Sequence, residues 1–144
     1  MRRYDPGAAS GSSRRITLAY RPFDTDLTPA TTAVVTLNVR AGVSLKVRPR
    51  RTTSRGRISF SGRLLGGPNR AGTQVQLFAV ARKGRDRVPV ATLRADRRGR
   101  FHFGYRFRRT FAPFTYYFQA VVPRQNSYPY ATGSSKRVSV RIVR

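Results

Sequence analysis

Residues 100–108 read RFHFGYRFR, and aromatic and basic side chains alternate along this stretch. The aromatic positions are Phe101, Phe103, Tyr105 and Phe107, and the positions between and beside them are mostly basic: Arg100, His102, Arg106 and Arg108. Successive side chains of a β-strand point to opposite faces of its sheet. The stretch therefore predicts a strand with its aromatic face in a core and its basic face in water.

The same two-residue period continues in five other segments, which are residues 43–47, 57–65, 73–81, 115–123 and 137–143, and a sixth candidate strand, residues 88–95, is less regular. Turn residues separate them, as in Asp96-Arg97-Arg98-Gly99, where Asp starts a turn and Gly accepts a positive φ. No segment repeats apolar residues at the spacing of a helix. Seven short strands predict an all-β fold, an antiparallel β-sandwich spanning residues 42–144.

Residues 16–39 look like a weak copy of the end of the chain. Residues 16–20 and 33–39 are strand-like, and the offsets are 101 residues from Pro22 to Pro123 and 104 from Val39 to Val143. We interpret residues 16–41 as a partial β-hairpin from a truncated preceding repeat, with chance similarity of two hairpins as the alternative. A lone hairpin is marginally stable, so we expect it to fray or to dock on the sandwich. Residues 1–15 are predicted to form a disordered polar tail.

Two motifs resemble those of known repeat domains: residues 61–77, SGRLLGGPNRAGTQVQL, and residues 96–101, DRRGRF. They are similar to the G-x-L/V, P, G-x-x-V-x-L and D-x-x-G-x-F pattern of bacterial Ig-like and carboxypeptidase-regulatory-like (prealbumin-like) domains. The stretch TYYFQA at residues 115–120 matches the penultimate strand of such modules. The resemblance implies a seven-stranded Ig-like β-sandwich, with Tyr116 as either a tyrosine corner or a plain core residue.

The resemblance also implies a role. Modules of this family are usually non-catalytic spacers, stalks or adhesive units, which would place the chain beside other Ig-like repeats in a secreted or cell-surface protein. The residues that follow Met1 stay polar through Arg15, so this chain shows no secretory signal peptide. We therefore expect either an intracellular protein or a piece of a longer one. The longest apolar run, about residues 77–81, is far short of the ~18 residues of a membrane span.

Composition excludes most catalytic and metal chemistry. The chain lacks Cys, which removes disulfides, thiolate metal sites and cysteine nucleophiles. His102 lies between two inward aromatic residues and is expected to face solvent, while Asp24 and Asp26 share a loop that does not separate their pKa values. Residues 62–67 lack the ending of a phosphate-binding loop. We expect no enzyme activity and no cofactor.

The charge is the feature that departs from an ordinary spacer. The chain has 30 Lys and Arg against five acidic residues, for a net charge of +25, and 27 of the 30 are Arg. In an Ig-like topology the first, second and fifth strands share a sheet. Their outward residues then form one candidate polyanion-binding field, which consists of Lys46, Arg48, Arg57, Arg63, Arg100, Arg106 and Arg108.

Three interpretations of this field remain open. The arginines reflect a compositional bias and are merely solvated, or they bind anionic cell-wall polymers or acidic glycans outside the cell, or they bind nucleic acid. Arg suits phosphate and carboxylate because its planar fork contacts two oxygens at once. Nucleic-acid binding also favours accessible aromatic side chains, and the sequence offers only four: Phe78, Tyr117, Tyr128 and Tyr130.

Overall fold

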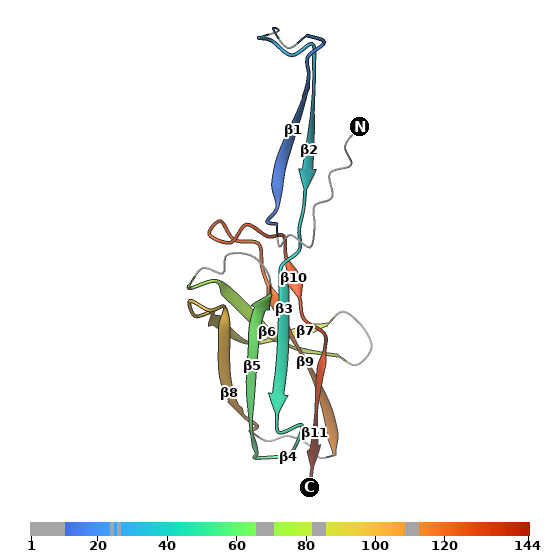
Figure 1. The fold of residues 1–144 in the computed structure, drawn as a ribbon. Coiled ribbons are helices and arrows are strands. Elements are labelled where there is room, and N and C mark those ends of the chain that lie inside the picture. The colour runs from blue at the N-terminus through green and yellow to red at the C-terminus, as the bar shows by residue number, and fades with distance from the viewer. Residues whose placement is uncertain (1–10, 24, 26, 66–70, 82–85, 109–112) are drawn as a thin grey trace.

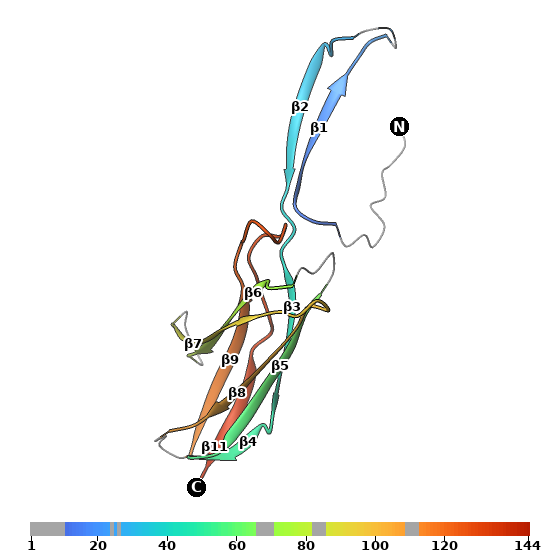
Figure 2. The same cartoon turned by 90° about the vertical axis from the view of Figure 1, so that its left-hand side faces the viewer.

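The computed structural model describes residues 11–23, 25, 27–65, 71–81, 86–108 and 113–144, and these residues form strands and turns without a helix. One sheet has the order β3 (Gly42–Arg48), β5 (Arg57–Leu65), β8 (Arg100–Arg106). The other has the order β4 (Arg51–Thr53), β11 (Val138–Val143), β9 (Phe114–Val122), β6 (Gln74–Val80), β7 (Arg87–Arg94), and β10 (Gly133–Ser134) also pairs with β9. The two sheets pack face to face (Figures 1 and 2).

The predicted all-β antiparallel sandwich is confirmed. Each of the seven predicted segments contains a strand, and the first, second and fifth lie together in the three-stranded sheet. Two short strands, β4 and β10, were not predicted. Strand β4 has only three residues and pairs in parallel with the end of β11, so its pairing depends on the meeting of distant segments.

The core lies between the inner faces of the two sheets. The buried residues of the three-stranded sheet include Val43, Leu45, Val47, Ile58, Phe60, Leu64 and Phe101, and those facing them include Val75, Leu77, Phe118, Ala120, Val122, Val138, Val140 and Ile142. The rings of Phe60 on β5 and Phe118 on β9 meet edge to face across the sandwich, 4.8 Å between centroids. Alternation therefore puts the apolar side chains of β3, β5 and β11 in the interior and their polar side chains outside, whereas β9 is buried continuously from Phe118 to Val122.

Gly62 on β5 makes room for a neighbouring aromatic ring. It lies between Leu45 and Phe101 in the register of the three strands. A Cβ atom built on Gly62 would be 2.1 Å from Phe101 Cζ and 2.4 Å from the carbonyl oxygen of Ser44. The turn before β8 also agrees with the sequence, because Gly99 has a φ of 71°.

The rings around Tyr116 fit a core tyrosine. Its ring lies 5.4 Å from that of Phe107, 4.8 Å from Phe114 and 6.3 Å from Phe118, centroid to centroid. Its hydroxyl has no hydrogen bond to any of the residues that the structure describes, so the loop contact of a tyrosine corner is not found.

None of the described segments is a helix that could cross a membrane.

Residues 14–37 form a separate hairpin, β1 (Arg14–Tyr20) paired with β2 (Thr31–Leu37). The hairpin projects beyond one end of the sandwich (Figures 1 and 2), and all of its strand residues are exposed. The two strands are paired along their length and do not dock on the sandwich, so the expected docking is not seen. Strand β1 also begins at Arg14, inside the predicted tail, of which residues 1–10 lie outside the described residues.

The base of the hairpin is tied to the loop between β9 and β10. Ser13 donates its backbone N–H to the carbonyl of Pro129 (2.7 Å), and its Oγ accepts the N–H of Val39 (2.9 Å). Ala131 donates to Val39 (2.8 Å) and accepts from Ala41 (2.9 Å). These bonds fix the short link that leads from β2 directly into β3.

We predict that Gly62→Ala destabilises the sandwich by about 2 kcal/mol or more, because the added methyl overlaps both a ring and backbone. Gly104→Ala is the matched control, since a Cβ at Gly104 on the adjacent strand meets no atom within 4 Å. Urea unfolding of both variants measures the difference. Equal stability of Gly62→Ala and Gly104→Ala would contradict the packing around Phe101.

Candidate polyanion-binding face

The outer surface of the three-stranded sheet carries six of the seven predicted basic residues, and we call it the basic face: Lys46, Arg48, Arg57, Arg63, Arg100 and Arg106. All six side chains are exposed. Cα partners arrange the outer residues in four rows: Ser44–Arg63–Arg100, Lys46–Ser61–His102, Arg48–Ser59–Gly104 and Arg57–Arg106. The structure thus brings together residues that are up to 60 positions apart in the sequence.

Two pairs of arginines stand directly opposite each other across β5 and β8. One pair is Arg63 with Arg100 and the other is Arg57 with Arg106. Arg57 and Arg63 are six positions apart on β5, which is about 20 Å at the rise of a strand. Directly opposed like charges destabilise a sheet, so each pair favours an anion placed between its guanidinium groups.

Between the two arginine pairs, β5 and β8 carry Ser59, Ser61, His102 and Gly104, while Lys46 and Arg48 of β3 stand beside them in the same rows. The side chain of His102 shares a hydrogen bond with that of Ser59, with 2.5 Å between Nε2 and Oγ. Ser44 Oγ donates to the carbonyl oxygen of Arg63 at 3.3 Å. Ser61 and Gly104 complete this stretch. An extended ligand along β5 and β8 therefore meets cations at both ends and a row of short polar side chains between them.

Two open hollows mark the two ends of the face. The larger, about 740 Å³, is lined by Lys46, Arg63, Arg94, Asp96, Arg100 and His102 among others. The second, about 570 Å³, is lined by Arg48, Arg57 and Arg106 with Ile58, Ser59 and Tyr105 among others. The larger hollow thus combines the Arg63–Arg100 pair with Lys46 and Arg94, and the second combines the Arg57–Arg106 pair with Arg48.

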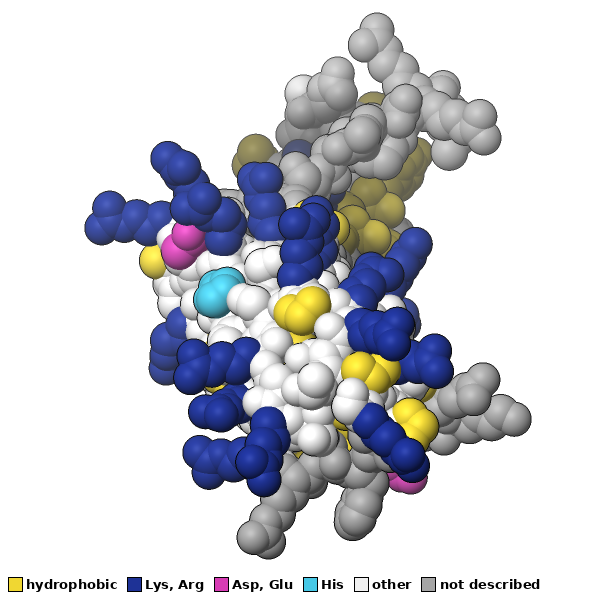
Figure 3. All heavy atoms as spheres, turned by 90° about the horizontal axis from the view of Figure 1, so that it is seen from below, with side chains coloured by type: hydrophobic (Ala, Val, Ile, Leu, Met, Phe, Trp, Pro, Cys, Tyr) yellow, Lys and Arg dark blue, Asp and Glu magenta, His cyan; other side chains and the backbone are white. Residues whose placement is uncertain are grey.

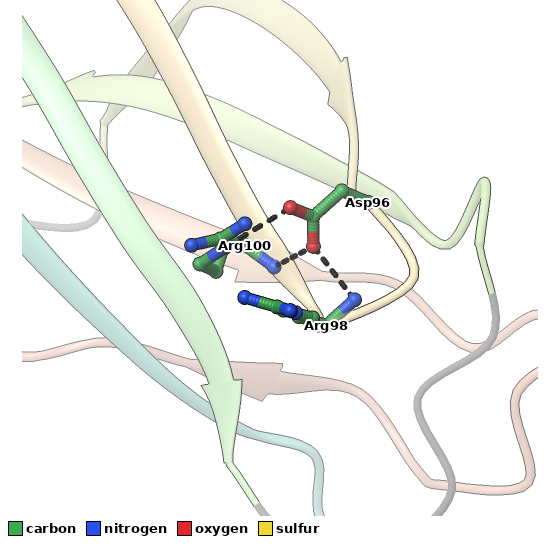
Figure 4. A network of polar contacts seen from close by, with 3 residues as sticks. All are labelled: Asp96, Arg98 and Arg100. Atoms are coloured by element: carbon green, nitrogen blue, oxygen red, sulfur yellow. Dashed lines mark hydrogen bonds and ion pairs between the residues drawn. The ribbon is translucent and has the colours of Figure 1, made fainter.

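The carboxylate of Asp96 lies at the larger hollow, and its oxygens accept hydrogen bonds from the turn before β8. Asp96 Oδ1 accepts the backbone N–H groups of Arg98 and Arg100, both at 2.8 Å, and Oδ2 accepts Arg100 Nε at 3.0 Å (Figure 4). The backbone bond from Arg100, the ion pair with its side chain and the backbone bond from Arg98 lower the pKa of Asp96 below its ordinary value. Arg100 is therefore partly neutralised.

The other cations of the basic face lack such a partner. Lys46, Arg48, Arg57, Arg63 and Arg106 form no ion pair with a carboxylate of the described residues. Arg106 Nε donates to the carbonyl oxygen of Arg55, at 3.4 Å. Most of the charge of the face is consequently left to solvent ions or to a ligand.

The seventh predicted residue, Arg108, lies just beyond the end of β8 and is exposed. Phe107 beside it is buried, and its N–H bonds the carbonyl of Gly56 at 3.0 Å, so the alternation continues past the strand. Arg108 shares a small hollow with Arg55 and Arg106. It extends the basic face at the end that holds Arg57 and Arg106.

Sequence reasoning missed Arg94, which lines the larger hollow although it belongs to β7 in the other sheet. Its Nη1 donates to the carbonyl of Gly72 at 3.3 Å. The tight turn from β7 to β8 carries it there, and no spacing rule connects it with Arg63.

Lys and Arg side chains also surround the sandwich in the end view of Figure 3, so the positive charge is not confined to the basic face.

The aromatic side chains that were expected to be accessible are mostly not so. Tyr128 and Tyr130 are only 1% and 5% exposed and their rings pack 4.6 Å apart, so that prediction is wrong. Phe78 and Tyr117 are half-buried, on strands of the other sheet. The basic face therefore has no aromatic platform from these four residues on which a nucleic-acid base could stack.

Within the described ranges, no group of three or more His, Cys, Asp or Glu side chains gathers to hold a metal ion. Comparison with models of known protein families and with curated proteins finds no match to this chain. The geometry and charge of the basic face are therefore the features of the molecule that bear on its function.

The lowered pKa of Asp96 predicts a loss of stability in acid. The folded state holds this carboxylate ionised, so its contribution is present above the ordinary pKa of 3.8 and is lost as the pH falls through the lower folded value. Asp96→Asn should reduce the fall of Tm with pH below 3.8, and Asp86→Asn, which removes a carboxylate from another exposed position, is the charge-matched control. Identical pH profiles for wild type and Asp96→Asn would contradict the described turn.

Proposed function

We propose that the chain is a non-enzymatic structural and binding module, an Ig-like repeat of a secreted or cell-surface multidomain protein. Its basic face contacts anionic polymers such as cell-wall phosphate polymers or acidic glycans. One observation carries this proposal: Arg57 faces Arg106 and Arg63 faces Arg100, and the two pairs lie about 20 Å apart. Among the described residues, Arg57, Arg63 and Arg106 have no carboxylate partner.

The length of the basic face favours a polymer over a single small anion. One phosphate or sulfate fits between the two guanidinium groups of a pair, but the second pair lies too far away to share it. A chain with repeated anionic groups satisfies both pairs and passes over Ser59 and Ser61 between them. Arg also binds oxyanions through two parallel hydrogen bonds, which gives each pair more than charge alone.

Nucleic acid is the alternative ligand for the same face. The high positive charge supports it, because phosphate neutralisation alone drives non-specific binding. The burial of Tyr128 and Tyr130 weighs against recognition of bases by stacking. We therefore favour a polymer recognised by its anionic groups.

The proposal predicts that removing the opposed pairs weakens polyanion binding. We expect Arg57→Ser with Arg106→Ser, or Arg63→Ser with Arg100→Ser, to reduce affinity for a teichoic-acid-like polyglycerol phosphate about tenfold, or about 1.4 kcal/mol. Arg87→Ser with Arg141→Ser is the control, because it removes the same charge from exposed positions of the other sheet. Titration calorimetry at matched salt measures all three.

Equal losses in the face variants and in the control would show that only total charge matters and would overturn the assigned face. Parallel titrations with DNA and RNA test the alternative. A clear preference for one nucleic acid over polyglycerol phosphate would replace the proposed ligand. Undetectable binding of every polymer would leave the arginines as a solvated surface and would refute the binding role.

The opposed pairs also predict that salt stabilises the domain. At ~0.5 M NaCl the Debye length falls to roughly 4 Å, so repulsion between the arginines is screened. We expect Tm to rise with NaCl and with added polyanion, and to rise less in the Arg63→Ser, Arg100→Ser variant. A Tm that does not change with salt would contradict the clustered charge.

A further inference from the structure

The β1–β2 hairpin has one apolar face. Its pairing puts Ile16 opposite Val35, Leu18 opposite Ala33 and Arg14 opposite Leu37. Partners across a ladder share a face, so one side of the hairpin presents Ile16, Leu18, Tyr20, Ala33, Val35 and Leu37, and we call it the hairpin face. The opposite side carries Thr17, Thr32 and Thr36 together with Arg15, Ala19 and Val34.

The hairpin face is exposed in the structure. Leu18 and Tyr20 are 57% and 63% exposed, and Ile16, Val35 and Leu37 are also exposed. A two-stranded hairpin is marginally stable by itself in water, and contiguous exposed apolar side chains mark interaction surfaces. The hairpin face thus has the apolar composition of a sheet face that packs in a protein core.

The β9–β11 hairpin of the sandwich identifies what such a face packs against. There Phe118 pairs with Val138 and Tyr116 pairs with Val140. We add 102 to the residue numbers of β1 and 103 to those of β2. The pair Ile16–Val35 then falls on Phe118–Val138, and the pair Arg14–Leu37 falls on Tyr116–Val140. The two hairpins therefore share both register and direction.

This superposition also matches the buried face. Ile16, Leu18 and Tyr20 fall on Phe118, Ala120 and Val122, which are buried in the core. Val35 and Leu37 fall on the buried Val138 and Val140, and Arg14 falls on the half-buried Tyr116. The offsets of 101 from Pro22 to Pro123 and 104 from Val39 to Val143 keep the same pairing but turn Thr17 inward, because a shift of one residue exchanges the faces of a strand.

In the sandwich, the sheet β3–β5–β8 covers the equivalent face, and Phe60 of β5 contacts Phe118. We propose that the hairpin face binds a three-stranded antiparallel sheet of this kind, contributed by a preceding repeat, and that β1 and β2 close that repeat as β9 and β11 close this one. The inference rests on the repeat character in the proposed function, but not on polyanion binding.

The junction fits this arrangement. Strand β2 leads into β3 along one direction (Figure 1), and Val39 in the link packs against the core of the sandwich. Backbone bonds from Val39 and Ala41 to Ala131 hold the link in place. Two complete sandwiches would therefore stack end to end, with the last strand of one running into the first strand of the next.

A second copy of this chain fits the hairpin face less well. Seven residues at ~3.4 Å and two strands give a footprint of about 24 Å by 10 Å, on the order of 240 Å². Stable association of separate chains usually buries roughly 800 Å² from each partner. A covalently linked sheet needs far less contact area, because the link supplies an effective concentration in the millimolar range.

Thiol labelling tests the proposal, because the chain has no native Cys. The variants are Leu18→Cys on the hairpin face and Thr17→Cys on the opposite side. Each is made in the natural chain and in an extended chain in which a duplicate of residues 42–115 precedes Arg14, as the offset of 102 requires. We expect both thiols to react rapidly in the natural chain, and Leu18→Cys to react at least ~100-fold more slowly in the extended chain, with Thr17→Cys unchanged.

Every other pattern overturns the proposal. Rapid labelling of Leu18→Cys in the extended chain means that this kind of sheet does not cover the hairpin face. Protection of Thr17→Cys instead means that the opposite side is the buried one. Protection of Leu18→Cys in the natural chain that grows with protein concentration means that a second copy covers it. Labelling rates do not depend on polyanions, so a failure of the binding proposal is seen separately by calorimetry.

Discussion

The contact between Phe60 and Phe118 joins the two sheets at the centre of the sandwich, and the placement of the functional groups follows from it. Both rings are buried and meet edge to face at 4.8 Å. Because side chains alternate along β5, burial of Phe60 and Ile58 sends Arg57, Ser59 and Ser61 to the outside. The same alternation on β8 aligns Arg100 and Arg106 beside them, so the packing of the core also builds the basic face.

Repulsion between arginines therefore destabilises the sheet where β5 pairs with β8. Arg57 faces Arg106 and Arg63 faces Arg100, and within the described residues only Arg100 of these four has a carboxylate partner. The buried apolar layer beneath them is large enough to hold the sheet together despite this repulsion. A polyanion relieves the repulsion on binding, which links the stability of the sheet to the proposed ligand.

The hairpin shows how much of a sandwich depends on having both layers. Strands β1 and β2 have the pairing register of β9 and β11, yet their apolar side chains are exposed while those of β9 and β11 are buried. Backbone pairing is thus satisfied within the hairpin, whereas apolar burial needs a second sheet. In a repeat array, each hairpin would pack on the three-stranded sheet of its own module. Neighbouring modules would then be joined where β2 leads into β3.

Local alternation was enough to predict the seven main strands of the sandwich and the exposed basic residues of β3, β5 and β8, because alternation is a property of neighbouring residues in the chain. The tertiary structure decided the burial of Tyr128 and Tyr130, the arrival of Arg94 beside Arg63 and the parallel pairing of β4 with β11. These features depend on contacts between segments far apart in the chain, for which no local pattern carries a signal.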